Sequence, residues 1–135
     1  MKKWLEVMVL LMVFSMLAGG CVMQQGKEKL EDLEFTVTKQ QDLPAALQEQ
    51  IEKKKEENFS LTYSDNEYLY LARGYGIQET GGYSISVDDC YRTENAICVK
   101  TTLHGPQVGE DVAKSPSYPY LVIKLELRSE PVIFQ

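Results

Sequence analysis

Hydrophobic residues follow three patterns along this 135-residue chain, and the first is a short unbroken run near its start. Two lysines precede an apolar run from Val7 to Leu17, and small residues then lead to Cys21. A basic start, a short apolar run and small residues at a cleavage point are the parts of a secretory signal peptide. The run is also shorter than the roughly 20 residues that a membrane-spanning helix needs. We therefore predict that residues 1–20 are a signal peptide and that the protein is exported.

The residues just before Cys21 resemble a bacterial lipoprotein box, in which the cysteine becomes the lipid-bearing first residue. The usual box has leucine three places before the cysteine, whereas here Ala18 holds that place and Leu17 lies one earlier. Cleavage by an ordinary signal peptidase is the alternative, and it would release a soluble protein. We predict acyl chains such as palmitate on Cys21, each buried CH₂ contributing about 0.8 kcal/mol of membrane affinity. The predicted location is the extracytoplasmic face of the cell membrane, where the lipid holds the protein.

The second pattern is helical and follows a polar stretch. Residues 21–33 are mostly polar with no clear period, which predicts a flexible tether. Residues 34–135 carry the periods of regular structure and are predicted to form a single domain. Leu43, Leu47 and Ile51 recur at a spacing of four, which places them on one face of an early helix.

The third pattern is strict alternation of apolar and polar residues, the period of a half-buried β-strand. The alternating stretches are 35–37, 59–63, 69–71, 83–87, 97–103, 121–127 and 132–134. About seven short strands and one early helix predict a mainly β (α+β) fold. We expect a small antiparallel β-barrel or sandwich with the helix packed on it.

Two cysteines flank the polar turn at residues 93–95. A three-residue loop there would set Cys90 directly opposite Cys98, on the face that points away from the core. The same register pairs Ile85 with Leu103, so the apolar positions agree with it. Because exported proteins meet an oxidising environment, we predict a disulfide between Cys90 and Cys98, the alternative being two free thiols.

Composition and charge exclude several classes of function. The chain has 14 basic and 20 acidic residues and a net charge of -6, so it lacks the positive field that nucleic-acid binding requires. A catalytic zinc site built on two or three histidines is excluded, since His104 is the only histidine. We predict no metal, no cofactor, no nucleic-acid partner and no catalytic residues.

Two loop segments carry the candidate binding residues. Paired glycines permit unusual backbone angles and close approach of another backbone, and a long connection with prolines and tyrosines is typical of a contact surface. The predicted binding residues are Thr80, Gly81, Gly82 and Tyr83 in the first segment, and Tyr118, Pro119 and Tyr120 at the end of the second. The alternatives are a tight turn with Tyr83 in the core, and a rigid strand entry with Tyr120 packed at the sheet edge.

Residues 59–127 resemble the C-terminal domain of the protease-complex subunit PrcB family, found in bacterial lipoproteins. The resemblance is carried by TGGYSI from Thr80, by the strand ending near Pro106, and by Tyr118–Pro119–Tyr120. It implies a single PrcB-like domain that acts as a non-catalytic accessory or binding module for an extracytoplasmic protease. It implies no catalytic residues.

TGGY also has a fainter similarity to the Thr-Gly-Tyr loop of chagasin-type protease inhibitors, although Gly82 intervenes and the tryptophan-bearing loop of those inhibitors is absent. We therefore predict a membrane-anchored protein-interaction module. A protease inhibitor acting through TGGY and a peptide- or sugar-binding lipoprotein remain the alternatives.

Overall fold

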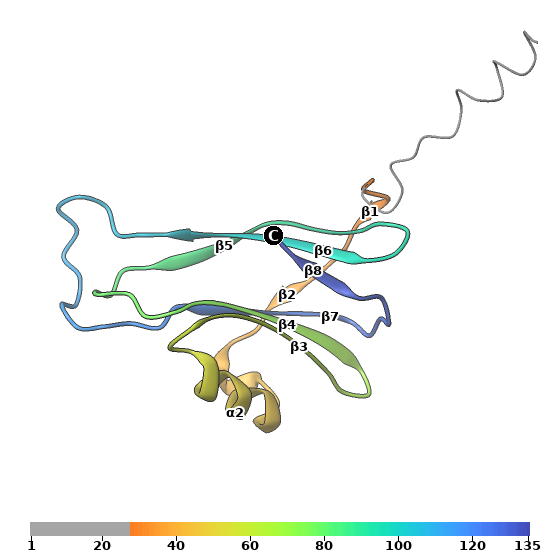
Figure 1. Cartoon of the computed structure of the whole chain (residues 1–135), viewed down its shortest axis with the longest axis horizontal. Coiled ribbons are helices and arrows are strands. Elements are labelled where there is room, and N and C mark those ends of the chain that lie inside the picture. The colour runs from red at the N-terminus through yellow and green to blue at the C-terminus, as the bar shows by residue number, and fades with distance from the viewer. Residues whose placement is uncertain (1–27) are drawn as a thin grey trace, which may run out of the picture.

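Two β-sheets pack face to face, and one α-helix covers the outer face of one of them (Figure 1). The structure is a computed structural model that describes residues 28–135, so the predicted signal peptide and Cys21 lie outside the described residues. The sheets do not close into a barrel. The predicted mainly β fold is therefore confirmed in its sandwich form.

Strands and helices follow one another in the order β1 (Glu31–Asp32), β2 (Thr36–Val37), the 3₁₀-helix η1 (Gln40–Asp42), α2 (Ala45–Lys54), β3 (Asn58–Ser64), β4 (Tyr68–Tyr75), β5 (Ser84–Arg92), β6 (Ile97–His104), β7 (Tyr120–Glu126) and β8 (Val132–Phe134). The sheet that we call the open sheet has the strand order β1-β5-β6-β8. The other, which we call the helix-covered sheet, has the order β2-β7-β4-β3.

One strand departs from the predicted antiparallel pattern, because β8 pairs with β6 in parallel. The connection 127–131 crosses from the end of β7 to the open sheet beside the start of β6. A chain that enters at that end can only run in the same direction as β6. This arrangement places Val132 next to Ile97.

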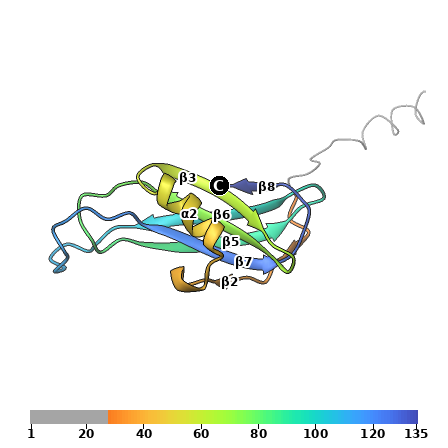
Figure 2. The ribbon, with the colours of Figure 1, turned by 90° about the horizontal axis from the view of Figure 1, so that it is seen from below.

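The sandwich has two hydrophobic cores, one on each face of the helix-covered sheet. Successive side chains of a strand point to opposite faces, so β4 sends Leu69 and Leu71 toward the open sheet and Tyr70 and Ala72 toward α2. The helix contributes Leu47 and Ile51 of the predicted face, whereas Leu43 lies before α2, directly after η1, and all three side chains are buried. Figure 2 shows α2 lying across this sheet.

The first two strands differ from their predicted form. β1 falls within the predicted tether, yet Glu31 and Asp32 pair with Arg92 and Tyr91 of β5. The side chain of Val37, on β2, is 55% exposed, since neither α2 nor the open sheet covers this short edge strand. The described chain therefore joins the domain earlier than the sequence pattern indicates.

The predicted pairing of Cys90 with Cys98 is wrong. The β5–β6 hairpin begins in the predicted register, with Ile85 opposite Leu103, but a bulge between Val87 and Asp89 inserts one residue into β5. Beyond the bulge, Cys90 lies opposite Val99, and Tyr91 lies opposite Cys98. Because a shift of one residue turns a side chain to the other face, Cys90 enters the core between the sheets while Cys98 stays on the outer face, and both thiols are free.

The turn that closes this hairpin accounts for the register beyond the bulge. Thr93 is buried, and its hydroxyl oxygen accepts hydrogen bonds from the backbone N–H of Asn95 at 3.3 Å and of Ala96 at 3.1 Å. Arg92 consequently pairs with Ile97 across a four-residue loop, one residue longer than predicted. The side chain of Thr93 is what stabilises the longer loop.

Candidate functional site

The two loop segments that carry the predicted binding residues lie side by side at one end of the sandwich (Figure 1, left). Segment 76–83 leads from β4 to β5 and segment 105–119 leads from β6 to β7, so both cross between the sheets. We call the two segments together the loop platform. The N-terminal strand β1 lies toward the opposite end.

Hydrogen bonds join the two segments of the platform. Gln78 and Ser117 exchange backbone hydrogen bonds at 2.9 and 3.0 Å. The N–H of Gly81 donates to the carbonyl of Ala113 at 2.9 Å, and the hydroxyl of Ser117 donates to the carbonyl of Thr80 at 2.7 Å. The platform is therefore a single unit in which hydrogen bonds hold the two loop segments together.

Gly82 allows the closest approach between the segments. Its φ of +86° lies in the left-handed region, and a Cβ atom there would lie 2.5 Å from Cγ1 of Val112 and 3.0 Å from Cβ of Pro106. Tyr83 follows and packs its ring on Gly105, where an added Cβ would lie 3.3 Å from the ring. The glycine pair thus provides the close backbone approach that the sequence indicates.

The platform does not gather the three candidate tyrosines into one surface. Tyr83 is half-buried against Gly105, whereas the ring of Tyr118 lies 5.2 Å from Nζ of Lys55 at the end of α2. Tyr120 packs against the core under the helix, and burial raises the pKa of its hydroxyl. The backbones of the predicted segments meet, while their rings lie on different sides.

Tyr118, Pro119 and Tyr120 instead line a shallow groove of about 340 Å³ beside the edge of β7. Across the groove lie Val37, Thr38 and Gln40. The N–H of Thr38 donates to the carbonyl of Val122 at 2.8 Å, after which the chain turns into η1. The edge of β7 that precedes Val122 therefore has no neighbouring strand among the described residues.

A polar cluster that sequence reasoning missed lies on the outer face of the open sheet. The hydroxyl of Ser86 is 2.8 Å from Nε2 of His104 and donates to Asp88 at 2.8 Å. Hydrogen bonds from Thr102 and Ser86 hold the pKa of the Asp88 carboxyl below its ordinary value. Strand alternation could have found it, because Ser86 is the direct partner of Thr102.

The order of these hydrogen bonds differs from that of a Ser–His–Asp triad. In a triad the carboxylate orients the histidine and the histidine accepts the serine proton. Here the carboxylate of Asp88 accepts the proton of Ser86, which leaves Nε2 of His104 to donate to the serine oxygen. The cluster is arranged to fix two strands of the sheet, and the expected lack of catalytic residues stays a prediction.

Neither a metal-binding cluster nor a membrane-spanning helix occurs among residues 28–135. Between residues 28 and 135, no three histidine, cysteine or acidic side chains are grouped closely enough to hold a metal ion. In the same part of the chain, no helix has both the length and the apolar character needed to cross a membrane.

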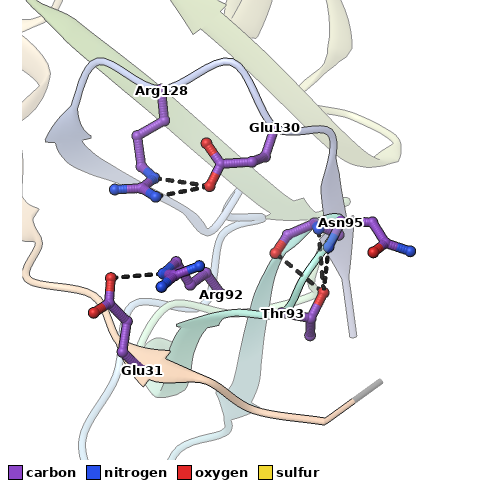
Figure 3. Close-up of polar contacts among 7 residues, drawn as sticks. Glu31, Arg92, Thr93, Asn95, Arg128 and Glu130 are labelled. Carbon is purple, nitrogen blue, oxygen red and sulfur yellow. Dashed lines mark hydrogen bonds and ion pairs between the residues drawn. The ribbon is translucent and has the colours of Figure 1, made fainter. Parts of the chain in front are cut away.

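An ionic cluster at the end of the sandwich away from the platform was also not predicted (Figure 3). Glu31 of β1 accepts from Arg92 at 2.7 Å, and Glu130 pairs with Arg128 at 2.8 Å. Arg128, with a smaller contribution from Arg92, lowers the pKa of the Glu130 carboxyl. The cluster joins the N-terminal strand, the end of β5 and the crossing to β8.

Comparison with known families identifies the segment that contains the platform. Residues 69–126 match the model of the family described as PrcB C-terminal. The match runs along β4, β5, β6 and β7 and includes both platform segments. No curated protein and no solved structure matches the chain. The predicted resemblance to the PrcB family is confirmed over residues 69–126, the segment that matches the PrcB C-terminal family.

Proposed function

We propose that this protein is a membrane-anchored, extracytoplasmic accessory module that binds a protease through its loop platform and performs no catalysis itself. The main support for the proposal is the family match, which supports association with a protease complex and spans both segments of the platform. The platform is also the place where the predicted binding residues of TGGY meet the long loop.

The geometry of the domain agrees with a lipid anchor at Cys21. Glu31 of β1 pairs with Arg92 at the end of β5, whereas the platform precedes Ser84 at its start. A nine-residue strand at about 3.3 Å per residue separates these points by roughly 26 Å. A domain held by residues before β1 would present the platform away from the membrane, toward a partner in the extracytoplasmic space.

The platform has the properties of a pre-organised contact surface. Its internal hydrogen bonds fix the backbone, which reduces the conformational entropy that binding must remove. Ile77 is 56% exposed and Val108 is fully exposed, so apolar side chains are available for contact on both segments. Glu110 stabilises the tip by accepting from the N–H of Gln107 at 2.9 Å.

A second candidate function is the binding of an extended peptide in the groove beside Tyr118 and Tyr120. It is favoured by the free edge of β7 there, because main-chain groups at a sheet edge can pair with an added strand. Inhibition of a protease by TGGY has less support. Thr80 and Tyr83 are half-buried and bonded or packed against the long loop, whereas an inhibitory loop must enter a cleft.

The proposal is tested by purifying the tagged full chain from detergent-solubilised membranes of its own organism and identifying co-purified proteins. The platform variant combines Ile77→Asp and Val108→Asp, both at exposed positions. The matched control is Glu94→Lys, an exposed residue in the β5–β6 turn at the other end. We expect a protease with the natural chain and the control but not with the platform variant. No protease in any sample, or equal recovery in all three, contradicts the proposal.

A further inference from the structure

The outer edge of β3 differs from the other outer strands of the two sheets. β3 pairs with β4 along seven residues and has no strand on its other side in the described part of the chain. The strands at the remaining outer positions, β1, β2 and β8, have two, two and three residues. Figure 2 shows β3 as the last strand of its sheet.

The register shows which backbone groups of β3 face outward. The N–H of Tyr75 in β4 donates to the carbonyl of Pro119, on the β7 side, at 3.1 Å. Because the backbone groups of successive residues point to opposite sides of a strand, the odd-numbered residues of β4 form hydrogen bonds with β7 and the even-numbered residues with β3. The partners of those even-numbered residues on β3 are Phe59, Leu61 and Tyr63. The N–H and C=O groups of the residues between them therefore point away from the sheet, as a template for another strand.

The seven residues of β3 have none of the features that usually protect an edge strand against pairing. Natural edge strands are kept apart by lysine, proline, bulges or short length. β3 has the sequence NFSLTYS, with no charged residue and no proline, and it pairs with β4 in an unbroken register. Leu61 and Tyr63 lie half-buried along the edge, packed against the core under α2.

We propose that a second copy of this chain pairs with β3 in antiparallel orientation, with Leu61 opposite Leu61 of the second copy. Only a register that pairs even-numbered with even-numbered residues lets the outward groups bond to each other, and among these the one centred on Leu61 overlaps all seven residues. It sets Phe59 opposite Tyr63 and Ser60 opposite Thr62. Apolar side chains then meet apolar ones beside α2, and hydroxyls meet hydroxyls on the other face.

Charge at the ends of the strand makes the pairing sensitive to salt. In this register Glu57 lies opposite Asp65 of the second copy, so like charges meet at both ends of the pair. The Debye length falls from about 10 Å at 0.1 M salt to about 3 Å at 1 M. The fraction of dimer should therefore rise with salt.

The register is tested by disulfide trapping in the full chain in detergent. In the proposed register Leu61 and its copy form a non-hydrogen-bonded pair. The Cα atoms of such a pair are about 4.5 Å apart, a distance that a disulfide can bridge. We expect Leu61→Cys to give a covalent dimer on mild oxidation. Tyr63→Cys is the matched control, because its two copies would lie roughly 13 Å apart along the strand and cannot bridge. Equal cross-linking of the two variants, or none with Leu61→Cys, overturns the proposal.

The association itself is tested by sedimentation of the uncross-linked full chain at both salt concentrations. Thr62→Pro removes an outward N–H that the β3–β4 ladder does not use, and Thr62→Lys adds charge while keeping that N–H. We expect dimers of the natural chain that increase with salt, and monomers for both variants. A natural chain that is monomeric at both salt concentrations overturns the proposal. Recovery of a protease is a separate readout, so the two proposals can fail independently.

Discussion

Gly82 lies so close to Val112 that a Cβ atom on the glycine would come within 2.5 Å of Cγ1 of the valine. This contact joins the TGGY segment to the long loop 105–119 and gives the loop platform its shape. Gly82 requires glycine for two reasons, its positive φ and the lack of space for a side chain. Gly109 requires it for one, because it has a φ of +84° but no neighbour within 4 Å.

Replacement of Gly82 by alanine should therefore destabilise the protein more than replacement of Gly109. Both changes force a side chain into the left-handed region, at roughly 1–2 kcal/mol. Gly82→Ala adds overpacking against Val112, typically about 1–3 kcal/mol. Free energies of unfolding from urea titrations measure the difference. Equal losses in the two variants would show that the contact with Val112 is not tight.

Both cysteines of the hairpin should be present as free thiols in the purified protein. Burial raises the pKa of the Cys90 thiol to about 11, so little thiolate forms at neutral pH and alkylation of the folded protein should be slow. After denaturation without reductant, both Cys90 and Cys98 should be alkylated in peptide mass spectra. Cys98→Ala serves as the control that loses one label. Labelling of Cys90 and Cys98 that requires a reductant would demonstrate the disulfide and contradict the register.

The ion pair of Glu130 with Arg128 should contribute to stability in a pH-dependent way. Because Arg128 lowers the pKa of Glu130 in the folded protein below the ordinary value of 4.5, the contribution is present above that value and is lost as the pH falls through the folded pKa. The two side chains are 25% and 27% exposed, so Glu130→Gln should cost no more than about 1 kcal/mol at neutral pH.

Unfolding free energies measured between neutral pH and pH 3 provide the check on Glu130. The gap between the natural protein and Glu130→Gln should close in acid. Glu94→Gln is the control, since Glu94 is exposed and forms no ion pair within residues 28–135. A gap that stays constant down to pH 3 would mean that the charge of Glu130 does not stabilise the fold.

The sequence predicted those features that depend on local period. Leu47 and Ile51 are buried on the predicted helix face, and alternation identified the long strands, because side-chain direction follows directly from spacing. The resemblance to the PrcB family also placed the two loops in one matched segment. These signals lie within single elements or short stretches of chain.

The features that were missed depend on contacts between distant residues. Nothing in the alternation of β5 indicates the bulge at Asp88, which displaced Cys90 from Cys98. The parallel entry of β8 and the cluster of Glu31, Arg92 and Glu130 depend on where the chain crosses between sheets. Only the folded arrangement of the two sheets brings these groups together.

Site-specific photo-cross-linking reports whether the loop platform touches a protease in the cell. A photoreactive residue at Val108, on the exposed tip of the platform, is compared in living cells with the same residue at Glu94, on the opposite turn. We expect a cross-link from position 108 to an extracytoplasmic protease and none from position 94. Cross-links to a protease from position 94 alone, or from neither position, would contradict this expectation.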